Sequence, residues 1–337
     1  MCDLRSSRIV RQLVVERLHS RITTNLHRRV SRSFGASTTA VNKAQHEQSY
    51  IELNFKQPPL VPVGWDQFNV TASQPVLFKA YQDPTISQPS RAVQLLSALT
   101  KGRDRIVEVE VGRYDDTRLD GFHQVSMRLG QYLDWLQSER TDGRVGGKQV
   151  YLAQWIGHGE IEAVRDIAFP PPVLSTLITR GRVDLYQSAL FLGPTGAVTP
   201  LHYDPYINLF HLQASSASND YAKHILLLPP SASELMRGSH AHSRHHNTST
   251  LDFQLHTDGS HECPRFRVTA SCGVSGTSKA RDVIERDAVT CILRENETLL
   301  IPRGWWHRVE NVALRDASCK HGGWTAGLSY WFLPRQQ

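Results

Sequence analysis

The second half of the chain consists of short strand patterns separated by turns, and this alternation constrains the fold more than any other feature. Apolar and aromatic residues are concentrated in six segments, residues 185–192, 208–213, 223–228, 298–301, 306–311 and 324–333. Gly-Pro, Pro-Pro and Pro-Arg-Gly sequences lie between them, and such residues end strands and form turns. Many short strands with this punctuation predict a β-sandwich or a β-barrel.

The earlier part of the chain combines helical and strand patterns. Apolar residues recur at helical spacing in residues 91–100 and 125–139, and residues 105–112 between them alternate as a strand does. We therefore expect an N-terminal helical and strand part over residues 49–150 and a β-rich core over residues 151–337. The serine-, histidine- and arginine-rich residues from about 231 to 286 are expected to form an insertion in that core.

The basic charge is concentrated at the N-terminus. The 337 residues have a formal net charge of +6, but residues 1–43 alone contain eight arginines and one lysine against Asp3 and Glu16. This segment therefore carries +7 and the remainder of the chain carries −1. The main domain accordingly has no charge excess that would favour direct binding to nucleic acid.

Residues 1–48 form an arginine-rich leader, which we interpret as a disordered basic tail or a targeting segment. We expect an intracellular protein of the nucleus or cytoplasm. Because the leader is rich in arginine and poor in acidic residues, mitochondrial import is the alternative. The five cysteines contain no CxxC pair, which argues for a reducing compartment. No apolar run approaches the roughly 20 residues that a membrane-spanning helix needs, so no membrane association is expected.

His202 and Asp204 form a His-x-Asp pair, and His307 follows about a hundred residues later in LLIPRGWWH. Residues two apart in an extended segment point to the same side, so the pair can bind one ion. A neighbouring strand would present His307. Two histidines and one carboxylate can occupy one face of Fe(II) and leave the other face open for O2 and a second ligand. A chance His-x-Asp pair is the alternative that these residues alone leave open.

A second group of histidines lies in the insertion. It lacks a zinc-type spacing with paired cysteines, so we interpret it as part of a solvated loop. Its members are His240, His242, His245, His246, His256 and His261.

Six ordered segments resemble the JmjC-domain Fe(II)/2-oxoglutarate oxygenases of the small hydroxylase-like subgroup. They are VEVEVGRY (107–114), YLAQW (151–155), FLGPTGAVTPLHYDPYINLF (191–210), KHILLLPP (223–230), HNTS (246–249) and LLIPRGWWH (299–307). The resemblance is greatest to the members described as arginyl hydroxylases and histone lysine demethylases. It implies a mainly β fold with flanking helices, the double-stranded β-helix or jelly roll of the cupins.

The resemblance assigns His202, Asp204 and His307 as the catalytic iron ligands. It also implies that Lys223 binds the far carboxylate of 2-oxoglutarate. Chemistry supports this role, because a dianion needs a cation and a buried lysine without a partner is costly. An exposed lysine at a strand end is the alternative. The last strand, GLSYWF, contains no basic residue that could take the place of Lys223.

Five further residues match family positions around the cosubstrate and the substrate. Tyr151 and Thr199 would hydrogen-bond the same carboxylate, and Asn208 would line the pocket. The alternatives are a core aromatic with a satisfied hydroxyl at Tyr151 and a simple strand residue at Thr199. Glu110 stands where related arginyl hydroxylases place an acid facing the substrate guanidinium, although an exposed strand glutamate would look the same. Phe191 replaces a tryptophan that the nearest relatives carry beside the substrate.

The chain departs from the family pattern most clearly around the expected substrate mouth. Besides Phe191, residues 213–222 are longer than the usual tight turn, and residues 313–323 form a second insertion. We expect an Fe(II)- and 2-oxoglutarate-dependent oxygenase that hydroxylates a protein or peptide side chain, arginine by resemblance. The alternatives are a histone lysine demethylase, an oxygenase of a small molecule or natural product, and a non-catalytic cupin-like binding protein.

Overall fold

The computed structural model describes residues 51–53, 55–80, 90–113, 121–138, 144–145, 148–168, 170–217, 220–237, 247–249, 251–256, 265–270, 277–314 and 323–335. The leader lies outside these residues. So does the histidine group, except that the backbone of His256 is described. None of the described helices is long and apolar enough to cross a membrane.

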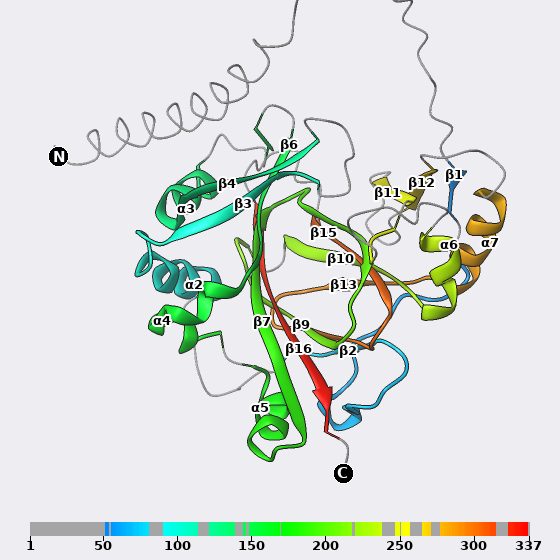
Figure 1. Cartoon of the computed structure of the whole chain (residues 1–337), viewed down its shortest axis with the longest axis horizontal. Coiled ribbons are helices and arrows are strands. Elements are labelled where there is room, and N and C mark those ends of the chain that lie inside the picture. The colour runs from blue at the N-terminus through cyan, green and yellow to red at the C-terminus, as the bar shows by residue number, and fades with distance from the viewer. Residues whose placement is uncertain are drawn as a thin grey trace, which may run out of the picture.

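Eight strands form a jelly roll of two antiparallel sheets (Figure 1). In the larger sheet they are β7 (Val183–Pro194), β9 (Ile207–Ser215), β14 (Thr298–Ile301) and β16 (Trp324–Pro334). The smaller sheet contains β8 (Val198–Tyr203), β10 (Tyr221–Leu228), β13 (Val289–Leu293) and β15 (Trp306–Ala313). This architecture confirms the expected mainly β, cupin-type fold.

The larger sheet extends beyond the jelly roll at both edges. One edge carries β2 (Val76–Phe78). The other carries β6 (Lys148–Trp155), β3 (Ile106–Gly112) and β4 (Phe122–Arg128), with β5 (Arg144–Val145) paired to β6. The extension therefore joins the N-terminal part of the chain to the core through the pairing of β3 with β6 and of β6 with β7.

Apolar side chains fill both faces of the central strands, which explains why their sequences read as continuous rather than alternating hydrophobic runs. Every residue of β9 and of β10 is buried. Phe210 and Leu212 pack against Ile225 and Leu227 between the two sheets. Their neighbours on the opposite face of each sheet are covered by other elements, so the jelly roll lies within a larger core.

Helices cover the outer faces of the two sheets (Figure 1). On the side of the larger sheet lie α2 (Arg91–Thr100), α3 (Leu129–Leu136), α4 (Glu162–Arg165) and α5 (Pro172–Thr179). On the side of the smaller sheet lie α6 (Ser233–Arg237) and α7 (Thr277–Asp287). Short 3-10 helices complete the described part: η1 (Trp65–Gln67), η2 (Ile156–Glu160) and η3 (Pro230–Ala232).

The predicted helix over residues 91–100 is confirmed, but the one over residues 125–139 begins too early. Residues Val125 to Arg128 belong to β4, because their backbone groups pair with β3. The side chain of Gln131 accepts a hydrogen bond from the Arg128 N–H at 3.1 Å, and α3 begins immediately after it. Apolar residues recur at helical spacing on both sides of the boundary between β4 and α3, so their spacing does not show where the helix begins.

The six predicted strands of the core are confirmed, five of them with longer ends. Because β9 continues to Ser215 and β10 starts at Tyr221, the connection that appeared to span residues 213–222 is only Ser216 to Asp220. The segment 231–286 does lie between β10 and β13, as expected of an insertion. It also contains β11 (Leu251–His256) and β12 (Arg265–Ala270), which pair with each other and with β1 (Ile51–Glu52) and which its weak periodicity did not predict.

Candidate metal centre

The pairing of β8 with β15 brings the two histidines together. His202 and His307 are directly opposite each other in the register of these strands, and their ring centroids lie 4.2 Å apart. Asp204 follows one residue after the end of β8. The N–H of Gly304, which has φ 78°, donates to the carbonyl oxygen of Asp204 at 3.0 Å and ties the Pro-Arg-Gly turn to this loop. Glycine suits such a left-handed turn because it has no Cβ.

The three side chains present one potential ligand atom each, and these atoms lie within 4.8 Å of one another. Nε2 of His202 is 3.9 Å from Oδ1 of Asp204, and Nε2 of His307 is 3.5 Å from Oδ2 of Asp204. The sequence prediction that distant residues meet at one point therefore holds in the geometry. A cluster of this composition offers two nitrogens and one oxygen, the donor set that suits Fe(II) with open positions.

Backbone carbonyls orient both imidazole rings. Nδ1 of His202 lies 2.9 Å from the carbonyl oxygen of Pro200, and Nδ1 of His307 lies 3.1 Å from that of Trp305. Since a carbonyl oxygen only accepts hydrogen bonds, Nδ1 carries the proton in each ring and Nε2 keeps its lone pair. This is the tautomer that a metal ligand needs, with the outer nitrogen holding the ring in place.

The electrostatics of the cluster favour a neutral His307 and an ionised Asp204. Burial, together with the neighbouring His202, lowers the pKa of His307 to about 4. Burial acts to raise the pKa of the Asp204 carboxyl, but the two histidines and the hydrogen bond from Trp331 outweigh it, so this pKa lies below its ordinary value. The charge state at neutral pH is therefore the metal-binding one.

Lys223 on β10 is fully buried and lies near Tyr151 and Phe210, two residues that line the pocket of the metal cluster. Its Nζ donates to Oδ1 of Asn311 on β15 at 2.7 Å and lies 5.9 Å and 5.7 Å from the ring centroids of Tyr151 and Phe210. Burial lowers its pKa to about 7. In the described part of the chain no carboxylate lies within ion-pair distance of Nζ. The alternative of an exposed strand-end lysine is wrong, and the ammonium group lacks an anion.

A glycine on a strand of the other sheet leaves space for the Lys223 side chain. A Cβ at Gly327 of β16 would lie 2.9 Å from Cε of Lys223 and 2.8 Å from two ring carbons of Phe210. Asn311 is fixed in turn, because its Nδ2 donates to the carbonyl oxygens of Gly193 and Pro194 at 2.9 Å and 3.0 Å. Its Oδ1 is therefore left to face Nζ. The lysine is held in one position although no charge compensates it.

The other predicted cosubstrate residues line one pocket with the metal cluster. Tyr151 is buried on β6 and its hydroxyl contacts the side chain of Thr199 on β8, while burial raises the pKa of the phenol. Asn208 on β9 is also buried. Its Nδ2 donates to Oγ of Ser329 at 3.3 Å, and its Oδ1 has no hydrogen-bond partner among the described residues. The pocket thus contains a polar atom still able to bind a ligand.

The two residues predicted to face the substrate are separated from each other. Phe191 lines the metal pocket, where its ring lies 6.4 Å from Tyr151, 6.0 Å from Phe210 and 6.2 Å from Trp331. Glu110 on β3 instead lines an adjoining cleft. It remains close to the pocket, because β3 pairs with β6 so that Glu110 is opposite Tyr151.

Two residues of the site were missed in the sequence. Trp331 donates its indole Nε1–H to Oδ2 of Asp204 at 2.7 Å, and Asn311 holds Lys223. Asn311 lies directly opposite Lys223 in the register of β10 and β15, a relation that no local pattern reveals. Trp331 lies in the segment GLSYWF, from which the sequence indicated only that no basic residue is present.

The fifth segment of the resemblance, HNTS, supports the strand that bears His202. His246 lies outside the described residues. Asn247 and Ser249 bond to the flanks of His202: the Tyr203 N–H donates to the carbonyl of Asn247 at 3.0 Å, and the Ser249 N–H donates to that of Leu201 at 2.8 Å. This segment is structural support for β8.

Comparisons with known proteins agree with this geometry. A family model described as a cupin-like domain matches residues 65–337. The protein named lysine-specific demethylase JMJ30 of Arabidopsis thaliana is 25% identical over 211 residues, which make up 63% of this chain and 41% of that protein. The chain therefore spans about two-fifths of the length of this curated relative. Because the family model covers far more than half of the sequence, the chain belongs to the family of cupin-like domains, and it is of the JmjC type.

Proposed function

We propose that this protein is an Fe(II)- and 2-oxoglutarate-dependent oxygenase that hydroxylates a side chain of a protein or peptide, with arginine as the target residue. The observation that supports this most strongly is the combination of two features in one barrel. The first is a set of two histidines and a carboxylate within 4.8 Å, and the second is the buried Lys223, which has no carboxylate at ion-pair distance among the described residues.

The residues present fit the two groups that this chemistry needs. Nε2 of His202, Nε2 of His307 and the carboxylate of Asp204 would hold Fe(II) and leave its remaining positions open. Lys223 would bind the far carboxylate of 2-oxoglutarate, and the hydroxyls of Tyr151 and Thr199 would donate hydrogen bonds to it. When bound, iron and 2-oxoglutarate would supply an oxidation by O2, in which one oxygen atom enters succinate as 2-oxoglutarate loses CO2 and the other converts a substrate C–H bond into C–OH.

The protein contributes binding, orientation and exclusion of water. Two carbonyls lock the imidazoles in the ligand tautomer, and Trp331 holds one oxygen of Asp204. Burial lowers the pKa of Lys223. A bound carboxylate would raise this pKa again, because it pairs with the charged form of the lysine. The apolar walls of Phe191, Phe210 and Ile301 keep the pocket dry.

Arginine as target rests on the resemblance and on the position of Glu110. Glu110 is directly opposite Tyr151 in the pairing of β3 with β6, and its carboxyl group lines a cleft that adjoins the metal pocket. A guanidinium group reaching the iron from that side would pass a carboxylate. The protein substrate also agrees with the name of the Arabidopsis relative, which describes a lysine demethylase.

Three alternatives differ in substrate or in class. Lysine demethylation uses the same oxidation on an N-methyl carbon and is suggested by the relative's name. A small-molecule substrate would be accommodated by Phe191 in place of a larger residue. A binding protein without catalysis is disfavoured, because the ligand triad and Lys223 are all present.

Succinate formation from 2-oxoglutarate with added Fe(II) tests the enzyme class. We expect turnover in the wild type and its loss in His202→Ala, with His211→Ala as a matched control because His211 is buried against Thr298 away from the pocket. Absence of both turnover and iron binding in the wild type would exclude the oxygenase.

Mass spectrometry of treated peptides then identifies the product. A gain of one oxygen on arginine is the expected result. Loss of a methyl group from methyl-lysine would identify a demethylase instead, and succinate formation without any change on peptides would indicate a small-molecule substrate.

A further inference from the structure

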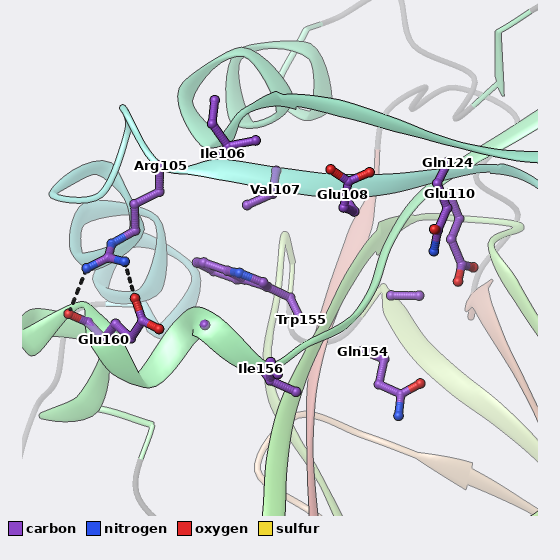
Figure 2. Close-up of a pocket in the computed structure, with 12 residues that line it drawn as sticks. Arg105, Ile106, Val107, Glu108, Glu110, Gln124, Gln154, Trp155, Ile156 and Glu160 are labelled. Atoms are coloured by element: carbon purple, nitrogen blue, oxygen red, sulfur yellow. Dashed lines mark hydrogen bonds and ion pairs between the residues drawn. The ribbon is translucent and has the colours of Figure 1, made fainter.

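A second cavity, of about 660 Å³, lies on the extension of the larger sheet (Figure 2). Its walls come from β3, β4, β6 and η2, none of which carries a metal ligand. Figure 2 shows the indole of Trp155 beneath β3, with the Arg105–Glu160 ion pair on one side and the carboxylates of Glu108 and Glu110 on the other. The cleft thus combines an aromatic surface with acidic groups.

A break in the strand ladder turns Trp155 into this cleft. The register of β6 against β7 shifts between Leu152 and Trp155, and Gln154 between them has φ 48°. Such a bulge redirects the following side chain. Gly157 leaves space for the ring, since a Cβ there would lie 2.8 Å from the indole Nε1. The indole is half-buried, so one part of its surface remains open to a ligand.

The acidic groups of the cleft are not all neutralised by the chain around them. Arg105 is paired with Glu160, both through its carboxylate and through its carbonyl oxygen at 3.2 Å. Glu108 accepts a hydrogen bond from Ser126. Within the described residues neither Glu108 nor Glu110 has a cation at ion-pair distance. Burial raises the pKa of Glu110 to about 7, and a bound cation would bring it down again.

The same chain contains a segment of matching chemistry. Residues 1–43, the basic part of the leader, carry +7 against −1 for the rest of the sequence, and all but one of their basic residues are arginines. A guanidinium group stacks on an indole face and binds carboxylates with two parallel hydrogen bonds, whereas a lysine ammonium acts as a point charge. The cleft offers both partners that arginine prefers. We propose that the basic part of the leader, residues 1–43, binds in the Trp155 cleft of its own chain.

The length of the leader allows this contact. The chain from Ile51 back to Arg17 can span up to about 110 Å when extended. A domain of this size is only about 50 Å across. Covalent attachment also raises the local concentration of the leader at the cleft to the millimolar range, so weak individual contacts suffice. The pairing of Glu110 with Tyr151 places a bound leader beside the metal pocket.

Binding of a labelled leader peptide to the full chain tests the contact without iron or 2-oxoglutarate, so it is independent of the proposed oxygenase activity. The probe is a fluorescein-labelled peptide of residues 1–43, followed by fluorescence anisotropy at low salt. The proteins are the wild type and a full chain in which the leader arginines are replaced by glutamine, namely Arg5, Arg8, Arg11, Arg17, Arg21, Arg28, Arg29 and Arg32. The second protein has no competing leader of its own.

We expect the arginine-free chain to bind the peptide at least about 10-fold more tightly than the wild type, whose cleft is occupied. Adding Glu108→Gln and Glu110→Gln to the arginine-free chain should weaken its binding of the peptide at least about 10-fold. The matched double variant Asp66→Asn/Glu234→Gln, which removes two exposed acids elsewhere, should not. Affinity should fall with salt, as surface charge contacts are screened.

Three results would overturn the proposal. The first is equal binding by the two acid-removed variants, which would make the attraction non-specific. The second is equal binding by the wild type and the arginine-free chain, which would show that the leader does not occupy the cleft. The third is a concentration-dependent dimer of the wild type in sedimentation that disappears in the arginine-free chain, which would assign the leader to a second copy. Circular dichroism of each variant verifies folding.

Discussion

Trp331 and Asp204 are joined by a hydrogen bond from the indole Nε1–H to Oδ2 of the carboxylate, at 2.7 Å. The tryptophan comes from the last strand of the larger sheet, whereas Asp204 follows a strand of the smaller one. This bond therefore links the two sheets at the metal cluster. It fixes the rotation of the carboxylate between the two histidines, because Oδ1 then faces His202.

Replacement of Trp331 by phenylalanine should weaken metal binding about 10- to 100-fold, the usual cost of losing a residue that orients a ligand. The ring volume is mostly retained, so the melting temperature should change little. Calorimetric titration with Mn(II) measures the affinity directly. Trp65→Phe is the matched control, since it loses an indole hydrogen bond to the carbonyl of Lys79 without touching the cluster. Equal metal affinity in Trp331→Phe and wild type would contradict the positioning role.

Replacement of Lys223 by methionine should abolish 2-oxoglutarate binding while the protein remains folded. Methionine fills a similar volume and carries no charge, so the buried site loses its only cationic group for the carboxylate among the described residues. The measurement is the rise in melting temperature on adding 2-oxoglutarate with Mn(II). Lys79→Met removes an exposed lysine and should retain the full rise. A rise of the same size in Lys223→Met would exclude the assigned role.

The stability of the wild type relative to Lys223→Met should depend on pH. The folded-state pKa of Lys223 is about 7, below its ordinary value of 10.5, so the unfolded chain binds more protons between these values. Stability therefore rises with pH across that window, and it is lowest relative to the variant below pH 7, where the buried lysine must be charged. Urea unfolding of both proteins at several pH values measures the difference. A constant difference from pH 6.5 to 9.5 would be evidence against a buried, depressed lysine.

Gly193→Ala should destabilise the protein and disturb Tyr151. A Cβ at Gly193 would overlap the Tyr151 ring, with 2.8 Å to Cε2, and would lie 3.2 Å from Cβ of Ala197. Overpacking of this kind costs about 1–3 kcal/mol in unfolding free energy. Gly159→Ala is the control, because nothing lies within 4 Å of a Cβ there. Urea unfolding compares the two, and equal midpoints would show that the strand can shift to accept the methyl group.

The prediction of the metal cluster from sequence depended on local rules. His202 and Asp204 are two residues apart in an extended segment, so their convergence follows from strand geometry alone. His307 required a partner strand, and the turn LLIPRGWWH indicated one. The family resemblance then assigned Lys223 and Tyr151, and the structure brings all five side chains to the same part of the barrel. The roles of the nine residues stay predictions until the ligands are measured.

Local patterns also account for six of the eight jelly-roll strands, but they do not show where strand pairing determines the structure. The start of the helix at Leu129 and the strand β8 depend on which backbone groups find partners across a sheet. Apolar spacing cannot show this, because the same residues can face a core from a helix or from a strand. For the same reason the sequence did not show that β9 and β10 extend into residues 213–222. The connection between them is therefore shorter than the sequence suggested.

By itself the sequence determined the β-rich class, the metal-binding residue types and their spacing, the segregation of basic charge into the leader, and the chemistry expected of the pocket. These depend on residue identity and short-range geometry. Tertiary structure alone decided that Trp331 holds Asp204, that Asn311 holds Lys223, and that Glu110 opens onto the Trp155 cleft rather than the metal pocket. Each of these joins residues from different strands, and strand register is set by packing of the whole core rather than by any local segment.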